Sequence, residues 1–148
     1  MFLVFFSLVY AILTYGIIMA AQQSLNLAVE EGARRLQQWA SDRATRANAA
    51  LATASSASAW VASMAGQGAT QIAVCDYSGA LTANNANAAT LCGGLVSGDD
   101  ASRVAVVVRY PYQASPLVPL LPGVDYLVPA LLGAQASVQL VDPVGQGG

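Results

Sequence analysis

Histidine and lysine are absent from this 148-residue chain, and all six of its positively charged side chains are arginines. A catalytic triad with histidine, a lysine Schiff base, a phosphate-loop lysine and a zinc site with histidine ligands are therefore excluded. Only 9% of the residues are charged and the net charge is −2, which leaves no basic surface for nucleic acid. Paired carboxylates and nucleophile–base arrangements are also missing, so we expect no enzymatic activity, no metal site and no cofactor.

Charge is missing from the first 29 residues, and Glu30 is the first charged side chain. Residues 1–20, MFLVFFSLVYAILTYGIIMA, are apolar at all but three positions. A helix of this length spans about 30 Å, the thickness of the hydrocarbon layer of a bilayer. The segment lacks the basic start and the short apolar core of a cleavable signal peptide. We therefore expect residues 1–24 to form an apolar helix that crosses a membrane or fills the core of a polymer.

Helix-forming residues continue without proline from Gln22 to Met64, so the same helix is expected to run on. Gly66 and Gly68 then end the helical pattern. The sequence predicts residues 25–65 as an amphipathic continuation of the first segment, which gives one helix of about 60 residues and about 90 Å. Its large side chains recur at three- and four-residue spacing: Leu25, Val29, Leu36, Trp39, Leu51, Val61 and Met64.

Residues 66–148 change to a period of two, which is typical of β-strands. We predict three strands, at 71–77, 103–110 and 135–141, and a loop in the Gly- and Asn-rich stretch between the first two. Three short strands are not stable alone in water, so the sheet should pack on the outer half of the helix. The fold class is therefore α+β, with a long N-terminal helix as an apolar stalk and a small antiparallel sheet as a head.

Residues 115–133 combine four prolines with nine leucine and valine side chains. The prolines forbid a regular helix over most of this loop, yet so much apolar surface must be buried. We predict that the head covers part of it and that an adjacent subunit covers the rest; closure of the head's own core is the alternative. The candidates for contact with the adjacent subunit are Leu117, Leu120, Leu121, Val124 and Leu127.

Cys75 and Cys92 both fall in the predicted head, and an even cysteine count there indicates a disulfide in an oxidising compartment. Closing this loop would stabilise the head by about 3 kcal/mol in the chain-entropy model. Two free thiols, or a link to another chain, are the alternatives. Two cysteines without histidine supply only half of a tetrahedral zinc site.

Two further clusters have plain structural explanations. Six side chains in the head could gather oxygen ligands for calcium, but their spacing fits no EF-hand loop and is typical of turns: Asp76, Asn84, Asn85, Asn87, Asp99 and Asp100. Four hydroxyls on the outer helix could be glycosylated, although a weakly polar helix face explains them more simply: Thr53, Ser55, Ser56 and Ser58.

The run LVYAILTYGIIMAAQQSLNLAVEEGARR (residues 8–35) resembles the N-terminal region of TadE-like proteins of tight-adherence pilus systems. Its Glu31–Arg34 segment corresponds to an E-G-A-R-like element of that family, and the stretch VAVVVRYPYQASPLVPLLPG (residues 104–123) resembles the family's strand, tyrosine–proline pair and proline–leucine loop. The resemblance implies a type IV pilin-like fold, a prepilin peptidase and a pilus assembly machinery as partners. Type IV pilins usually carry a glutamate at the fifth mature position, where this chain has Phe5.

We therefore expect a structural subunit that lies in the bacterial inner membrane and then polymerises with copies of itself into an extracellular filament. A minor pseudopilin that primes or caps another protein's pilus, and a monomeric membrane-anchored binding module, are the alternatives. The tyrosine hydroxyls in the apolar run need partners, which neighbouring helices or a membrane interface would supply. The residues expected to form the polymerisation helix are Phe2, Phe5, Phe6, Leu8, Tyr10, Ile12, Leu13, Tyr15, Ile17 and Ile18.

Overall fold

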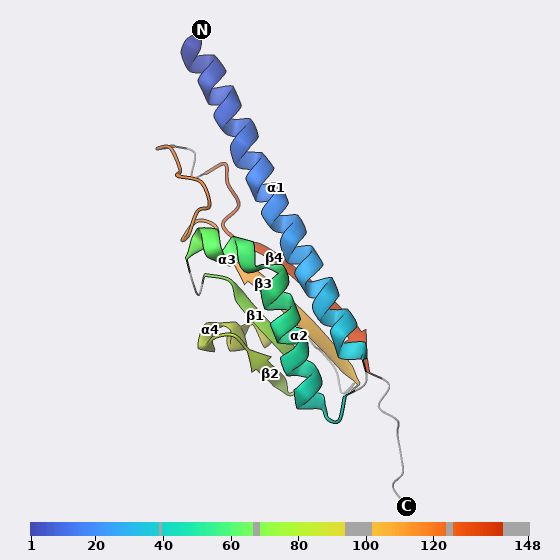
Figure 1. The fold of residues 1–148 in the computed structure, drawn as a ribbon. Helices are drawn as coiled ribbons and strands as arrows, with labels where there is room; N and C mark the ends of the chain where they lie inside the picture. Colours follow the sequence, from blue (N-terminus) through green and yellow to red (C-terminus); the bar gives the residue numbers. More distant parts are fainter. Residues whose placement is uncertain (39, 67–68, 94–101, 124–125, 141–148) are drawn as a thin grey trace, which may run out of the picture.

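The structure, a computed structural model, describes residues 1–38, 40–66, 69–93, 102–123 and 126–140. One end of the longest helix projects beyond the rest of the molecule, and a small antiparallel sheet packs against its other end (Figure 1). The predicted α+β class is confirmed. Within the described residues the elements are α1 (Phe2–Gln37), α2 (Arg43–Ala57), α3 (Ala59–Ala65), β1 (Gln71–Asp76), β2 (Gly79–Ala83), α4 (Ala86–Ala89), the 3₁₀ turn η1 (Thr90–Cys92), β3 (Arg103–Tyr110) and β4 (Leu132–Gln139).

The prediction of a single helix through residue 65 is wrong. α1 ends at Gln37, and α2 runs back alongside it in the antiparallel direction (Figure 1). The direction is fixed by contacts, because Ser24 of α1 donates a hydrogen bond to the carbonyl of Ala57, whereas Gly32 of α1 lies against Ala50 and Ala54. α1 therefore has 36 residues and a length of about 54 Å, and residues 25–65 form a helical hairpin instead of a stalk.

The break between α1 and α2 has a local cause at Asp42. Its carboxylate accepts a hydrogen bond from the backbone N–H of Thr45 at 2.6 Å, so Asp42 is the N-cap of a new helix. Gln38 and Asp42 both have extended backbone angles, which separate the two helices. The carboxylate–amide bond also lowers the pKa of Asp42, because it favours the charged form.

The sheet has the strand order β2-β1-β3-β4, and every neighbouring pair is antiparallel. Val106 of β3 lies between Val74 of β1 and Ala136 of β4, so β3 occupies the centre of the core. The alternation predicted for residues 103–110 is confirmed, because the following side chains face the helices and are buried with Ile72 and Val74: Val104, Val106, Val108 and Tyr110.

Strand β2 is missing from the sequence-based prediction, which placed a loop after residue 77. A tight turn joins β1 to β2, because the Asp76 carboxylate accepts hydrogen bonds from the N–H groups of Ser78 and Gly79 and from the Ser78 hydroxyl. Gly79 has a φ of +131°, which few other residues adopt. Residues 94–101 of the predicted loop lie outside the described residues.

The opposite face of the sheet carries a smaller cluster around the two cysteines. The structure joins Cys75 of β1 to Cys92 of η1 in a disulfide, with the two Cα atoms 5.4 Å apart. Ala73 and Val107 of the sheet pack here with Leu91 and Ala88. This bond ties the α4–η1 segment to the strand next to the centre of the sheet.

Candidate assembly surface

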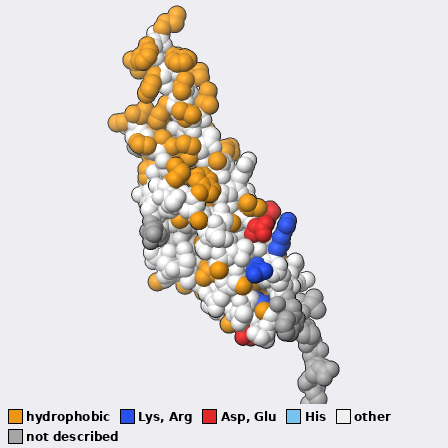
Figure 2. All heavy atoms as spheres, viewed as in Figure 1, with side chains coloured by type: hydrophobic (Ala, Val, Ile, Leu, Met, Phe, Trp, Pro, Cys, Tyr) orange, Lys and Arg blue, Asp and Glu red, His pale blue; other side chains and the backbone are white. Residues whose placement is uncertain are grey.

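The two halves of α1 differ in what covers them. In the C-terminal half (residues 18–37), one stripe is buried against α2 and the sheet, and it includes Leu25, Val29 and Leu36. In the N-terminal half (residues 2–17), Thr14 is the only described side chain that is buried. Figure 2 shows hydrophobic side chains gathered over this projecting end, and the charged side chains visible in that view lie at the other end of the molecule.

The length and composition of α1 allow it to cross a membrane. Most of the residues predicted to form the polymerisation helix are exposed. Tyr10 and Ile17 are half-buried, and Ile18 is buried in the core and therefore belongs to the head. The exposed members of the set are Phe2, Phe5, Phe6, Leu8, Ile12, Leu13 and Tyr15.

The proline–leucine loop lies along the N-terminal half of α1 (Figure 1), an arrangement that the sequence did not reveal. The Tyr10 hydroxyl donates a hydrogen bond to the carbonyl of Pro119 at 2.6 Å, and the Tyr15 hydroxyl donates to the carbonyl of Leu127 at 2.9 Å. Gln22 extends the series by donating to the carbonyl of Gly133 at 2.8 Å. The expectation that neighbouring helices or an interface supply the tyrosines' partners is wrong, because the chain's own loop supplies them.

The five predicted loop contacts divide between the head and its surface. Leu117 is buried in the core and Leu120 packs against it, so these two serve the head itself. Leu121 and Leu127 are 43% and 66% exposed and remain available to a neighbour. Val124 lies outside the described residues. Closure of the head's own core is therefore confirmed for Leu117 and Leu120, and contact with an adjacent subunit stays a prediction for Leu121 and Leu127.

A pair of tyrosines anchors the start of the loop. The rings of Tyr110 and Tyr112 are fully buried and meet edge to face, with centroids 6.3 Å apart. The Tyr110 hydroxyl donates to the carbonyl of Ser115, which closes the first turn after β3. Burial raises the pKa of both tyrosines, because it disfavours the charged form.

Between the loop and α1 lies an apolar groove of about 240 Å³. The Thr14 side chain forms part of its wall, and its hydroxyl has no hydrogen-bond partner among the described residues. We use the name α1–loop groove for this space. Its lining consists of Ser7, Tyr10, Ala11, Thr14, Tyr15, Leu121, Leu127 and Val128.

The side chains considered for calcium serve the local fold. Asp76 holds the β1–β2 turn and lies 3.8 Å from Arg43. Asn84 pairs with the backbone of Ile72 and Thr70, and Asn85 is the N-cap of α4. Asp99 and Asp100 lie outside the described residues. In the part of the chain that the structure describes, no group of three or more His, Cys, Asp or Glu side chains could hold a metal ion.

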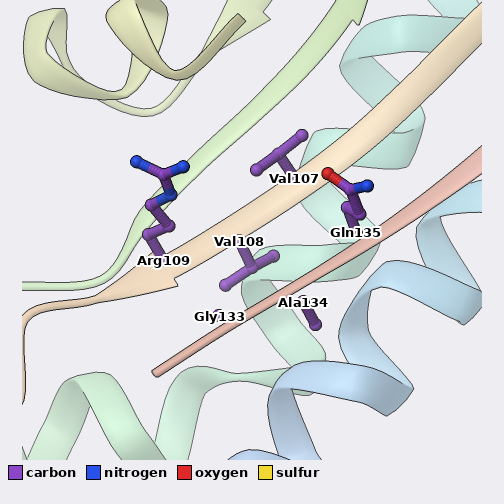
Figure 3. A pocket seen from close by; sticks show the side chains of 6 residues that line it. All are labelled: Val107, Val108, Arg109, Gly133, Ala134 and Gln135. Atoms are coloured by element: carbon purple, nitrogen blue, oxygen red, sulfur yellow. The ribbon is translucent and has the colours of Figure 1, made fainter. Parts of the chain in front are cut away.

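The hydroxyl cluster on α2 and a hollow on the sheet show no arrangement of side chains typical of a catalytic site. Ser55 and Ser56 are exposed but donate to carbonyls of their own helix, and Ser58 is buried. A hollow of about 310 Å³ lies where β3 ends and β4 begins, and Arg109 is the one charged side chain among the six described residues that line it (Figure 3). Neither place brings a nucleophile and a base together.

A long apolar helix with an uncovered first half, packed by its second half on a small antiparallel sheet, is a pilin-like arrangement. Residues 1–34 match the family model described as TadE-like protein. This match confirms the resemblance over the segment that contains the apolar run and the Glu31–Arg34 element. No curated protein and no solved structure matches the chain. Helix and family match together fit a pilin-like protein that is associated with a Tad pilus.

Proposed function

We propose that this protein is a structural pilin subunit that polymerises through the N-terminal half of α1 into an extracellular filament. The observation that carries the proposal is the exposure of this half, whose phenylalanines at positions 2, 5 and 6 are 82%, 67% and 53% exposed. Each large apolar side chain removed from water contributes about 1.5–3 kcal/mol, so this surface requires a dry environment.

Lipid and a bundle of identical helices are two such environments. A uniformly apolar helix is stable in the bilayer, and transfer into a helix bundle replaces lipid contacts with helix contacts. Gly16 supports the second environment, because a Cβ at this position would meet nothing within 4 Å and a neighbouring helix has room to approach its backbone. Ala11 and Ala20 are exposed as well, whereas Ala21 is buried in the head.

The proposed route follows from these two environments. The subunit waits in the inner membrane with the disulfide-bearing head in the oxidising periplasm, and the pilus machinery then moves it into the filament. A prepilin peptidase and this machinery are the partners that the family resemblance implies. The inter-subunit contact involves the exposed leucines of the loop, Leu121 and Leu127, in addition to α1.

The experiment is electron microscopy and mass spectrometry of filaments sheared from cells that produce the protein. The proposal expects this chain to be the principal component along the whole filament, with antibody against the head bound at regular intervals. A chain that stays entirely in the membrane fraction contradicts the proposal.

A minor pseudopilin is the second candidate, because TadE-like proteins, whose family model matches residues 1–34, are generally regarded as minor pseudopilins. In that case the same experiment finds this chain at few copies per filament and confined to an end, with another protein as the repeating subunit.

A further inference from the structure

Among the described residues, no side chain fills the α1–loop groove. Hydrogen bonds from Tyr10 and Tyr15 hold the loop against α1 on either side of it. Thr14 in its wall is 2% exposed, and its hydroxyl has no partner among the described residues. Because the described lining is mostly apolar, the groove is completed by an occupant that is itself mostly apolar.

The size and charge of the groove define this occupant further. A cavity of roughly 150 Å³ in an apolar core takes up a benzene molecule, so about 240 Å³ accommodates a phenyl ring. None of the described side chains that line the groove is charged, so they offer no partner to an anionic or cationic ligand. The first charged residue of the chain is Glu30, so the N-terminal half of α1 is equally free of charge.

The chain itself carries aromatic groups of this kind on the same half of α1. Phe2, Phe5 and Phe6 are spaced three and four residues apart, which places them along one side of the helix. Fully covering their exposed surfaces removes roughly 400 Å² from water, about half of what one partner contributes to a specific interface.

We propose that the α1–loop groove receives Phe5 or Phe6 of a second copy of this chain, an inference that rests on the proposed polymerisation. Within one chain the ring cannot reach the level of Thr14, because Phe5 precedes Thr14 by nine residues on the same helix. A parallel neighbour shifted along the helix axis by roughly 12–14 Å brings its ring to the level of Thr14. Ring and groove are different surfaces, so each copy both inserts and receives, and the contact repeats without closing.

The first test is oxidative cross-linking of filaments that carry Phe5→Cys with Leu127→Cys. Within one chain these positions lie too far apart for a disulfide, because Leu127 is bonded to Tyr15, ten residues or roughly 15 Å beyond Phe5 along α1. The proposal expects a ladder of covalent oligomers. Val4 is exposed and lies two positions from both Phe2 and Phe6, on the side of α1 turned away from them, so Val4→Cys with Leu127→Cys is the matched control and should give at least tenfold fewer oligomers.

The second test keeps all three phenylalanines and places a photoreactive benzoylphenylalanine at Leu127, which is 66% exposed. The proposal expects an adduct between this residue and residues 2–8 of another copy. An adduct with lipid, or with another pilus protein, overturns it, as do filaments in which neither test joins two copies. If filaments form but these cross-links do not, the groove proposal fails and the proposed polymerisation stands. If the unmodified chain forms no filaments, both proposals fail.

Discussion

The two halves of α1 are continuous in sequence and in structure, yet they meet opposite demands. The C-terminal half buries a stripe of apolar and small side chains and keeps Glu30, Arg34 and Arg35 on the outside. The N-terminal half has no charge, and apolar side chains surround it on most sides. The C-terminal half of this helix therefore forms part of the head's core, whereas the N-terminal half exposes apolar side chains that the isolated chain does not cover.

The two glycines of α1 show the same difference between a packed half and an uncovered half. A Cβ at Gly32 would lie 3.2 Å from Val106 and 3.3 Å from the carbonyl oxygen of Ala50, so this glycine lets α1, α2 and β3 meet. A Cβ at Gly16 would meet nothing within 4 Å. One glycine serves packing that the head already has, and the other is open to contact from outside.

The largest expected effect comes from a charge in the N-terminal half. Ile12→Asp places an unpaired carboxylate in a dry helix bundle or in lipid, at a cost of several kcal/mol per subunit. Ile12 is 63% exposed in the isolated chain, so the head should fold normally in detergent. We expect filaments to disappear from the sheared fraction, as seen by electron microscopy. Asn48→Asp, on the exposed face of α2, is the control and should leave filaments unchanged.

The next effect concerns the head alone. Cys75→Ser removes the bond to Cys92 and should lower the free energy of unfolding of the head by about 3 kcal/mol, since the closed loop has a sequence separation of 17. Chemical denaturation in detergent measures this loss, and membrane insertion should stay normal because α1 is unchanged. Intact-mass analysis without reductant is the check on the premise, which fails if the wild-type protein carries two free thiols.

A smaller effect separates the two glycines. Gly32→Ala should destabilise the head by about 1–3 kcal/mol, because the methyl group forces α2 or β3 to move. Gly16→Ala should leave unfolding unchanged or stabilise α1 by up to about 1 kcal/mol. Thermal unfolding of both variants in detergent gives the comparison. Equal destabilisation would mean that the N-terminal half is packed in the monomer after all.

The smallest effect tests the turn between α1 and α2. The pKa of Asp42 is lowered in the folded chain by its bond to the Thr45 amide, so its contribution is present above the unfolded value near 3.8 and is lost as pH falls through the folded pKa. Asp42→Asn keeps a capping side chain without this titration. Its unfolding midpoint should therefore depend less steeply on pH between 5 and 3, as measured by circular dichroism. Identical slopes would show that the cap carries no charge effect.

Local pattern was enough to predict the β3 alternation and the pairing of the two cysteines. It failed where long-range contacts decide the structure. Residues on both sides of the α1–α2 turn are equally good helix formers, and the hairpin is held by Gly32 against Ala50 and Ala54, which have no distinct local pattern. Asp42 followed by Thr45 was the available signal.

The candidate surface shows the same limit. The exposed phenylalanines follow directly from the apolar run, because a head this small leaves them uncovered. The docking of the loop could not be predicted, since its bonds from Tyr10 and Tyr15 join residues 109 and 112 positions apart. The one available signal was chemical: two hydroxyl donors lie in an apolar helix, and a proline-rich loop has carbonyl groups that can accept their hydrogen bonds.

Residue accessibility in lipid-free filaments tests the division of α1 most directly. Single cysteines at Ile12 and at Asn48 are labelled with a maleimide in sheared filaments and again after detergent has dispersed them. The account predicts that the cysteine at position 12 is protected in the filament and reacts after dispersal, whereas the cysteine at position 48 reacts in both states. Equal labelling of both positions in intact filaments would contradict it, because the N-terminal half of α1 would then not be the buried core of the assembly.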